Sequence, residues 1–217
     1  MGFLSAFQRR PLTDPAQSVE KFSGLLTCYL EKTAHPATSC DAPITLIARS
    51  PSMAAARALI LHASEIRSRQ IGVQIVFAKL APIDQLAQLS AALQLVDPRN
   101  PRVGKIRFIR NSALLDAHEQ LVLGRELCWT GDMLRRCDEH RNGLNIVEEG
   151  QPGPIRLAEL SFNAIWTAAK PVPARALNGH PLAPAFGSAK PAFGVSGLPG
   201  SEKAPALIPG APALTRH

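Results

Sequence analysis

The sequence predicts an α/β fold in which a mixed sheet is flanked by helices. Two short apolar runs rich in β-branched residues, 44–48 and 72–77, have the composition of buried strands. Each is followed by a longer stretch in which apolar residues recur at helical spacing, and residues 105–109 then repeat the strand pattern. Strand, helix and strand in this order imply right-handed parallel crossovers.

Length and composition predict one domain with an additional segment at each end. The chain has 217 residues, of which 46% are hydrophobic, and this suffices for one domain of about 150 residues. We place the domain at residues 14–170, after a flexible N-terminal segment, residues 1–13. Residues 171–217 are rich in Pro, Ala and Gly and poor in charge, so this tail is expected to be disordered.

Three helices are expected before residue 100. The first spans residues 15–31, because Pro15 suits the first helical position and apolar residues follow at helical spacing. The second and third span residues 53–69 and 83–96, each between two predicted strands. Their apolar faces should pack on the sheet.

The third predicted strand carries a row of cations. Ile106 and Phe108 alternate with Lys105 and Arg107, and Arg110 follows. This row is the best candidate for an anion-facing surface, although a solvated edge strand explains it as well.

A hairpin and a helix are expected after residue 111. Residues 116–123 end in an apolar block, Gly124 supplies a turn, and residues 126–132 form the returning strand. Asp132 is then expected to act as the N-cap of a helix over residues 133–140. A histidine beside a helix N-terminus, here His118, forms a site that can bind and attack phosphate, although most single histidines on strands are structural.

The run from His118 to Asp132 resembles the signature of the phospholipase D superfamily, H-x-K-x-x-x-x-D followed by G-S-x-N. In that family the His is the nucleophile, and the Lys and Asn hold the phosphate. A strand at residues 144–147 and a helix at residues 158–169 are expected where the family has them. The resemblance covers residues 16–170 and implies a phospholipase D-like half. Because a working site in the family combines two signature copies, it also implies a homodimer through the signature face.

The departures from the signature predict an impaired site. The Lys position is Gln120, and a neutral amide cannot supply the charge that a transferring phosphoryl group needs. The expected Asp falls at Arg125 or is deleted, the Ser position is Asp132, and the Asn position is Leu134. A carboxylate at a helix start opposes phosphate.

The first functional hypothesis is therefore a catalytically impaired phospholipase D-like domain that serves protein assembly or regulation as a homodimer. The alternative is a dimeric phosphodiesterase, nuclease or phospholipid transferase with His118 as nucleophile. In that case Arg107, Arg110 or Arg125 would have to hold the phosphate in place of the missing Lys. Neither hypothesis requires a cofactor or a metal. Cys137 and His140, three residues apart, are interpreted as a core thiol and a surface side chain.

A third hypothesis is an adaptor for nucleic acid or an anionic membrane. The net charge is +7, with 17 Arg and 7 Lys, but no dense basic run occurs, and an aromatic content of 5% disfavours base stacking. Phe3 and Phe7 beside Arg9 and Arg10 would suit peripheral contact with an anionic membrane, although a frayed terminus explains them as well.

The tail and the cysteines complete the predictions. Phe186 and Phe193 stand in two Pro-Ala-Phe-Gly copies, which suit a docking motif for a protein partner, although drift in a Pro-rich spacer explains them equally. The four cysteines lack a Cys-x-x-Cys pair, and no secretory signal is evident. Reduced thiols and a cytoplasmic location are therefore expected.

Overall fold

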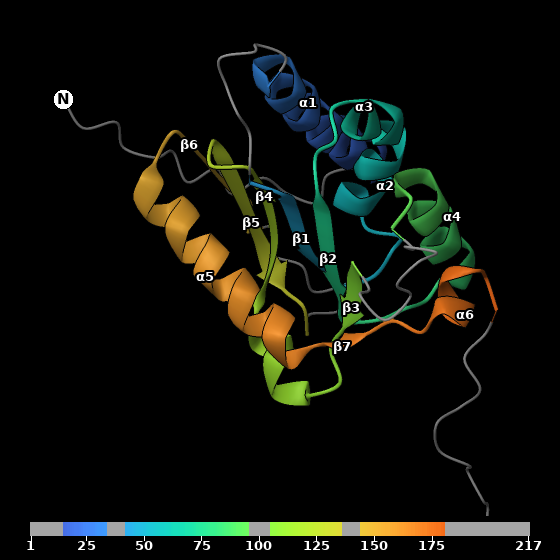
Figure 1. Ribbon diagram of the computed structural model, residues 1–217. Coiled ribbons are helices and arrows are strands. Elements are labelled where there is room, and N and C mark those ends of the chain that lie inside the picture. The colour runs from blue at the N-terminus through green and yellow to red at the C-terminus, as the bar shows by residue number, and fades with distance from the viewer. Residues whose placement is uncertain (1–14, 34–41, 96–104, 136–143, 181–217) are drawn as a thin grey trace, which may run out of the picture. The chain divides into compact units, whose positions relative to one another are not determined.

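The fold is built on a mixed sheet with helices on both faces (Figure 1). The computed structural model describes residues 15–33, 42–95, 105–135 and 144–180. These residues form a seven-stranded sheet with the order β6-β5-β4-β1-β2-β3-β7. The strands are β1 (Ile44–Ala48), β2 (Val73–Phe77), β3 (Ile106–Phe108), β4 (His118–Leu123), β5 (Leu127–Met133), β6 (Ile146–Glu149) and β7 (Lys170–Pro171).

The centre of the sheet is parallel and its flanks are antiparallel. Strands β1, β2 and β3 run in the same direction, as the predicted crossovers require. The hairpin of β4 and β5 joins β1 on one side, and β6 extends it. Gly124 has φ of 56° in the hairpin turn, a backbone conformation that glycine adopts without strain. The predicted α/β class with a mixed, helix-flanked sheet is confirmed.

In the described part of the chain, one helix covers one face of the sheet, and the other helices cover the opposite face (Figure 1). Alternation along the strands decides which side chains meet which layer. Leu46 and Ile75 belong to the larger core under the several helices, whereas Ile47 and Val76 pack with Phe162 of the single helix. The larger layer contains α1 (Pro15–Thr33), α2 (Ala54–Leu61), α3 (Ala63–Ser68), α4 (Ile83–Leu93) and α6 (Ala174–Leu177), and the single helix is α5 (Pro152–Ala168).

Helix boundaries differ from the predictions by a few residues at several ends, and the differences are largest at two places. The helix predicted over residues 53–69 is interrupted at His62, which has φ of −97° and ψ of 9° and separates α2 from α3. Helix α5 begins at residue 152, earlier than the predicted residue 158, because proline is well suited to the first helical turn. The strand predicted at residues 144–147 is β6, displaced by two residues.

The predicted domain boundary at residue 170 is wrong, because the fold continues to residue 180. Strand β7 pairs with β3, and the Val172 amide donates to the Ile106 carbonyl at 3.0 Å. Val172, Ala176 and Leu177 are buried in the larger core. A few buried apolar side chains thus anchor this segment, which is rich in Pro and Ala, to the core of the domain. Residues 1–13 and 181–217, with Phe186 and Phe193, lie outside the described residues.

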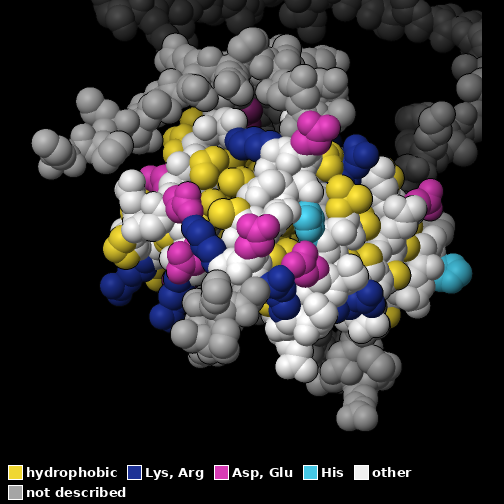
Figure 2. All heavy atoms as spheres, turned by 90° about the horizontal axis from the view of Figure 1, so that it is seen from above, with side chains coloured by type: hydrophobic (Ala, Val, Ile, Leu, Met, Phe, Trp, Pro, Cys, Tyr) yellow, Lys and Arg dark blue, Asp and Glu magenta, His cyan; other side chains and the backbone are white. Residues whose placement is uncertain are grey.

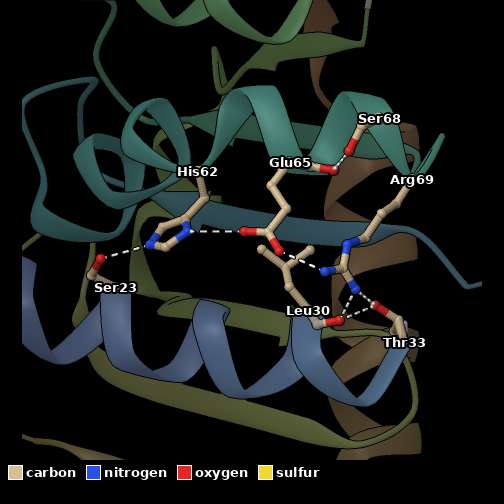
Figure 3. A network of polar contacts seen from close by, with 7 residues as sticks. All are labelled: Ser23, Leu30, Thr33, His62, Glu65, Ser68 and Arg69. Carbon is tan, nitrogen blue, oxygen red and sulfur yellow. Dashed lines mark hydrogen bonds and ion pairs between the residues drawn. The ribbon is translucent and has the colours of Figure 1, made fainter. Parts of the chain in front are cut away.

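A network of polar side chains joins α1 to α2 and α3 (Figure 3). Ser23 Oγ lies 2.6 Å from His62 Nε2, and the Glu65 carboxylate pairs with Arg69 at 2.6 Å. The Arg69 guanidinium in turn donates to the Leu30 carbonyl near the end of α1. The side chain of His62 therefore contributes to helix packing at the position where the helix is interrupted.

None of the helices in the described part of the chain has the length and apolar character required to cross a membrane.

Candidate functional site

The candidate site lies at the edge of the sheet where β1, β2 and β3 end, which we call the carboxyl edge. This edge is at the bottom of Figure 1. Strand β4 is antiparallel to β1, with Gln120 opposite Ile47, so β4 begins at the carboxyl edge with His118. Ligands of open α/β sheets bind outside the carboxyl ends of the strands. The predicted position of His118 thus coincides with the place where such folds carry sites.

The His118 imidazole is held in one tautomer. Its Nδ1 lies 2.9 Å from the Gly131 carbonyl oxygen. Because a carbonyl only accepts, Nδ1 carries the proton and donates, which leaves Nε2 with a lone pair. The residue is exposed at the start of β4. His118 therefore has the form that a nucleophile or a general base requires.

The returning strand contains a bulge opposite His118 and Gln120. His118 pairs with Met133 and Gln120 pairs with Thr130, so β5 has one more residue than β4 between these pairs. Asp132 lies in this irregular part of β5 and is 7% exposed.

Asp132 does not cap a helix, which corrects the prediction. Its carboxylate accepts from the Leu144 amide at 3.3 Å. The chain leaves β5 along the segment that precedes β4, because the amides of Leu134 and Arg135 donate to the carbonyls of Ala117 and Leu115. A helix therefore does not start at Met133, and residues 136–143, with Cys137 and His140, lie outside the described residues.

Gln120, at the Lys position of the signature, is buried and 8% exposed. Its Oε1 has no hydrogen-bond partner among the described residues. Leu134, at the Asn position, is 2% exposed and packs with Phe162 beneath α5. Neither position therefore carries a positive charge for a phosphate.

Two of the three candidate arginines lie away from His118. The Arg107 guanidinium stacks over the Trp166 ring at 4.4 Å and donates to the Trp166 carbonyl at 2.7 Å. Arg125 lies in the hairpin turn, at the other end of β4 and about 20 Å from His118. Arg107 and Arg125 therefore do not lie where binding of a phosphate at His118 would require them, which corrects the two predictions. In addition, β3 pairs with β2 and β7, so it is not the edge strand considered from the sequence.

Arg110 follows β3 at the carboxyl edge and is exposed, but three strand spacings, about 14 Å, separate β3 from β4. The sequence analysis missed Arg49. It follows β1, the neighbour of β4, and its amide donates to the Glu119 carboxylate at 3.1 Å. The available signal was a cation directly after a predicted parallel strand.

Two buried carboxylates belong to the same pair of strands as His118. Glu119 is the next residue and is 4% exposed, and Asp132 lies across the bulge in β5. The Glu119 carboxylate accepts a hydrogen bond from the Arg49 amide, and the Asp132 carboxylate accepts one from the Leu144 amide. Because side chains alternate along a strand, Glu119 and His118 point to opposite faces of the sheet.

The network of Figure 3 also contains a serine, a histidine and a carboxylate, the combination of a hydrolase triad. Its geometry does not match, because His62 Nδ1 lies 3.9 Å from the Glu65 carboxylate, beyond hydrogen-bond distance. Ser23 also lies inside α1, where the helix uses the neighbouring amides. We interpret the network as structural.

Among the described residues, no group of three or more His, Cys, Asp or Glu side chains is arranged to hold a metal ion.

Cys128 should be an unreactive thiol. Burial, and secondarily the Glu148 carboxylate at 3.6 Å, raises the pKa of Cys128 to about 12. In a Cys40→Ser, Cys137→Ser background, a maleimide at pH 8 should therefore label exposed Cys28 at least about tenfold faster than Cys128. Peptide mapping over time measures both rates.

Because the pKa of the Cys128 thiol in the folded protein is above that of an unfolded thiol, this group should also make the fold less stable as pH rises above about 9. Equal labelling rates in the folded protein would contradict this burial.

Comparison of the chain with protein-family models, with curated proteins and with solved structures gives no match in any of the three.

Proposed function

We propose that this chain is a catalytically impaired phospholipase D-like domain that acts as a protein-assembly or regulatory module, as a homodimer. The observation that carries the proposal is the surroundings of His118. Buried, neutral Gln120 stands where the signature has a lysine, and buried Leu134 stands where it has an asparagine. Transfer of a phosphoryl group requires positive charge at this place. The chain thus keeps the histidine of the signature but not the lysine and the asparagine that hold the phosphate in that family.

The homodimer is proposed through the carboxyl edge, which is the signature face. A two-fold interface joins the same patch of both copies, so the patch must complement itself. This edge carries both charge signs. Asp116 pairs with Arg135 at 3.0 Å, and Lys79 and Arg110 follow β2 and β3. Such a patch can pair with its own copy.

An active phosphodiesterase is the second candidate, and the tautomer of His118 favours it. Its Nε2 carries a lone pair in the direction away from the Gly131 carbonyl. Arg49 would then replace the missing lysine, since it follows the strand next to β4. Arg110 of this or a second copy would be the further cation at the edge.

An adaptor for nucleic acid has less support. Figure 2 views the molecule from the end opposite to the carboxyl edge, and acidic and basic side chains are interspersed over that face. The net charge of +7 is thus not gathered there into a patch of one sign.

The test is hydrolysis of bis(p-nitrophenyl) phosphate by the wild type and by His118→Ala, over a range of pH and protein concentration. We expect no turnover above background in either protein, because the phosphate lacks a cationic partner. Turnover in the wild type that disappears in His118→Ala would select the phosphodiesterase.

Light scattering after size exclusion tests the homodimer in the same samples. Arg110→Glu should weaken the dimer, whereas Arg125→Glu, at the opposite end of β4, should leave it intact. A dimer that responds only to Arg125→Glu would place the interface elsewhere. A wild type that remains monomeric at every concentration would exclude the homodimer.

A further inference from the structure

A cavity of about 130 Å³ lies between α5 and the sheet, at the end of β1 opposite to the carboxyl edge. Its position follows from the path of α5, which crosses the sheet diagonally (Figure 1). The start of α5 packs on β4 and β5 through Ile155 and Ala158, and its end packs on β1 and β2 through Ile165. The first residues of β1 and β2 are therefore left uncovered by α5 on this face.

Polar side chains line this cavity on two central strands. Thr45 of β1 and Gln74 of β2 are opposite each other in the register, so their side chains lie next to each other on the α5 face. Thr45 is 8% exposed, and its Oγ1 is buried without a hydrogen-bond partner among the described residues. An unpaired buried hydroxyl is costly, so a ligand that supplies its partner is favoured.

Among the described residues, the lining carries a single charged side chain, the Glu159 carboxylate of α5. Asn163, one turn further along the helix, and Gln74 add two amide oxygens, and Val122 and Phe162 provide apolar wall. No Lys or Arg is found among the lining residues that the structure describes. Its electrostatics therefore select against an anion and in favour of a cation.

We propose that this cavity binds a small organic cation, namely a primary ammonium with a short apolar chain. The ammonium has three N–H donors, which match the oxygens of Glu159, Thr45 and one amide. The chain then packs against Val122 and Phe162. The volume is well below the about 300 Å³ of pockets for drug-sized molecules, so the ligand has only a few non-hydrogen atoms. This site is separate from the carboxyl edge and does not depend on the function proposed for it.

The test is a titration of the full-length protein at constant ionic strength, in which binding is monitored through the amide chemical shifts in NMR spectra. Propylammonium is the probe, propionate has the opposite charge, and tetramethylammonium is a cation without N–H donors. Propylammonium should bind saturably in about the millimolar range. Tetramethylammonium should bind about tenfold more weakly, and propionate should not bind. The shifts should be confined to residues around Thr45 and Glu159.

Variants identify the groups responsible. Glu159→Gln should weaken propylammonium binding about tenfold, and Thr45→Val, which is close in shape, should weaken it several-fold. Glu20→Gln, on the exposed side of α1, is the matched control and should bind like the wild type.

Three results would overturn the proposal: absence of saturable propylammonium binding to the wild type, equal binding of propionate, or wild-type affinity in both cavity variants. If Glu159→Gln does not fold, the affinity of Thr45→Val decides.

Discussion

Replacing Gly131 by alanine should lower the free energy of unfolding by about 3 kcal/mol. A Cβ at this position would lie 2.5 Å from Cη2 and 2.6 Å from Cζ2 of Trp129. The indole cannot move aside without loss. Its ring meets Phe22 edge to face with centroids 4.7 Å apart, and its Nε1 donates to Asn145 at 2.7 Å. The close approach of Trp129 to the β5 backbone therefore requires glycine.

Urea denaturation followed by circular dichroism measures this effect, with Gly24→Ala as the control. Gly24 lies in the middle of α1 and a Cβ there would meet nothing within 4 Å. That variant should be more stable by up to about 1 kcal/mol, because alanine favours the helix. If Gly131→Ala matched the wild type, the indole would have to pack elsewhere. The Gly131 carbonyl also accepts a hydrogen bond from His118 Nδ1, so the variant should disturb this histidine as well.

Ending the chain at residue 170 should destabilise the fold by about 4 kcal/mol relative to a chain that ends at residue 180. The shorter chain loses Val172, Ala176 and Leu177, which are 3%, 0% and 6% exposed. It also loses the pairing of Pro171 with Arg107 and the hydrogen bond from the Val172 amide to the Ile106 carbonyl. The core beneath α4 would thus be opened to water.

The comparison of the two truncated chains uses the full-length protein as the reference. The chain of residues 1–180 should unfold at the same urea concentration as the full-length chain. Leu177→Ala in the full-length protein should cost about 3 kcal/mol, since a buried leucine is removed. Equal stability of the chains that end at residues 170 and 180 would show that β7 and α6 add nothing to the fold.

Much of the architecture was predictable from local pattern. The runs at residues 44–48 and 72–77 are too apolar and too β-branched for an exposed segment, and they became the buried strands β1 and β2. Gly124 between two alternating runs predicted the hairpin, and its positive φ confirms the turn. These features depend on residues close in sequence.

The candidate site was predicted only in part. His118 was singled out by its motif, and the structure places it at the edge of the sheet where ligands bind. The partners offered for it were wrong where their roles depended on distant residues. Arg107 is held by Trp166, 59 residues away in sequence, and Asp132 by the amide of Leu144. Protein assembly through the carboxyl edge stays a prediction.

The sequence by itself determined the alternation of strands and helices, the hairpin and the position of its histidine, because periodicity and turn residues act over a few positions. Only the tertiary structure decided the rest. The diagonal path of α5 leaves Thr45 and Gln74 beside a cavity, and the bulge in β5 draws Asp132 away from a helix start. Val172 and Leu177 join a core that begins far earlier in the chain. These outcomes depend on contacts between remote segments, whose free energies outweigh local preference.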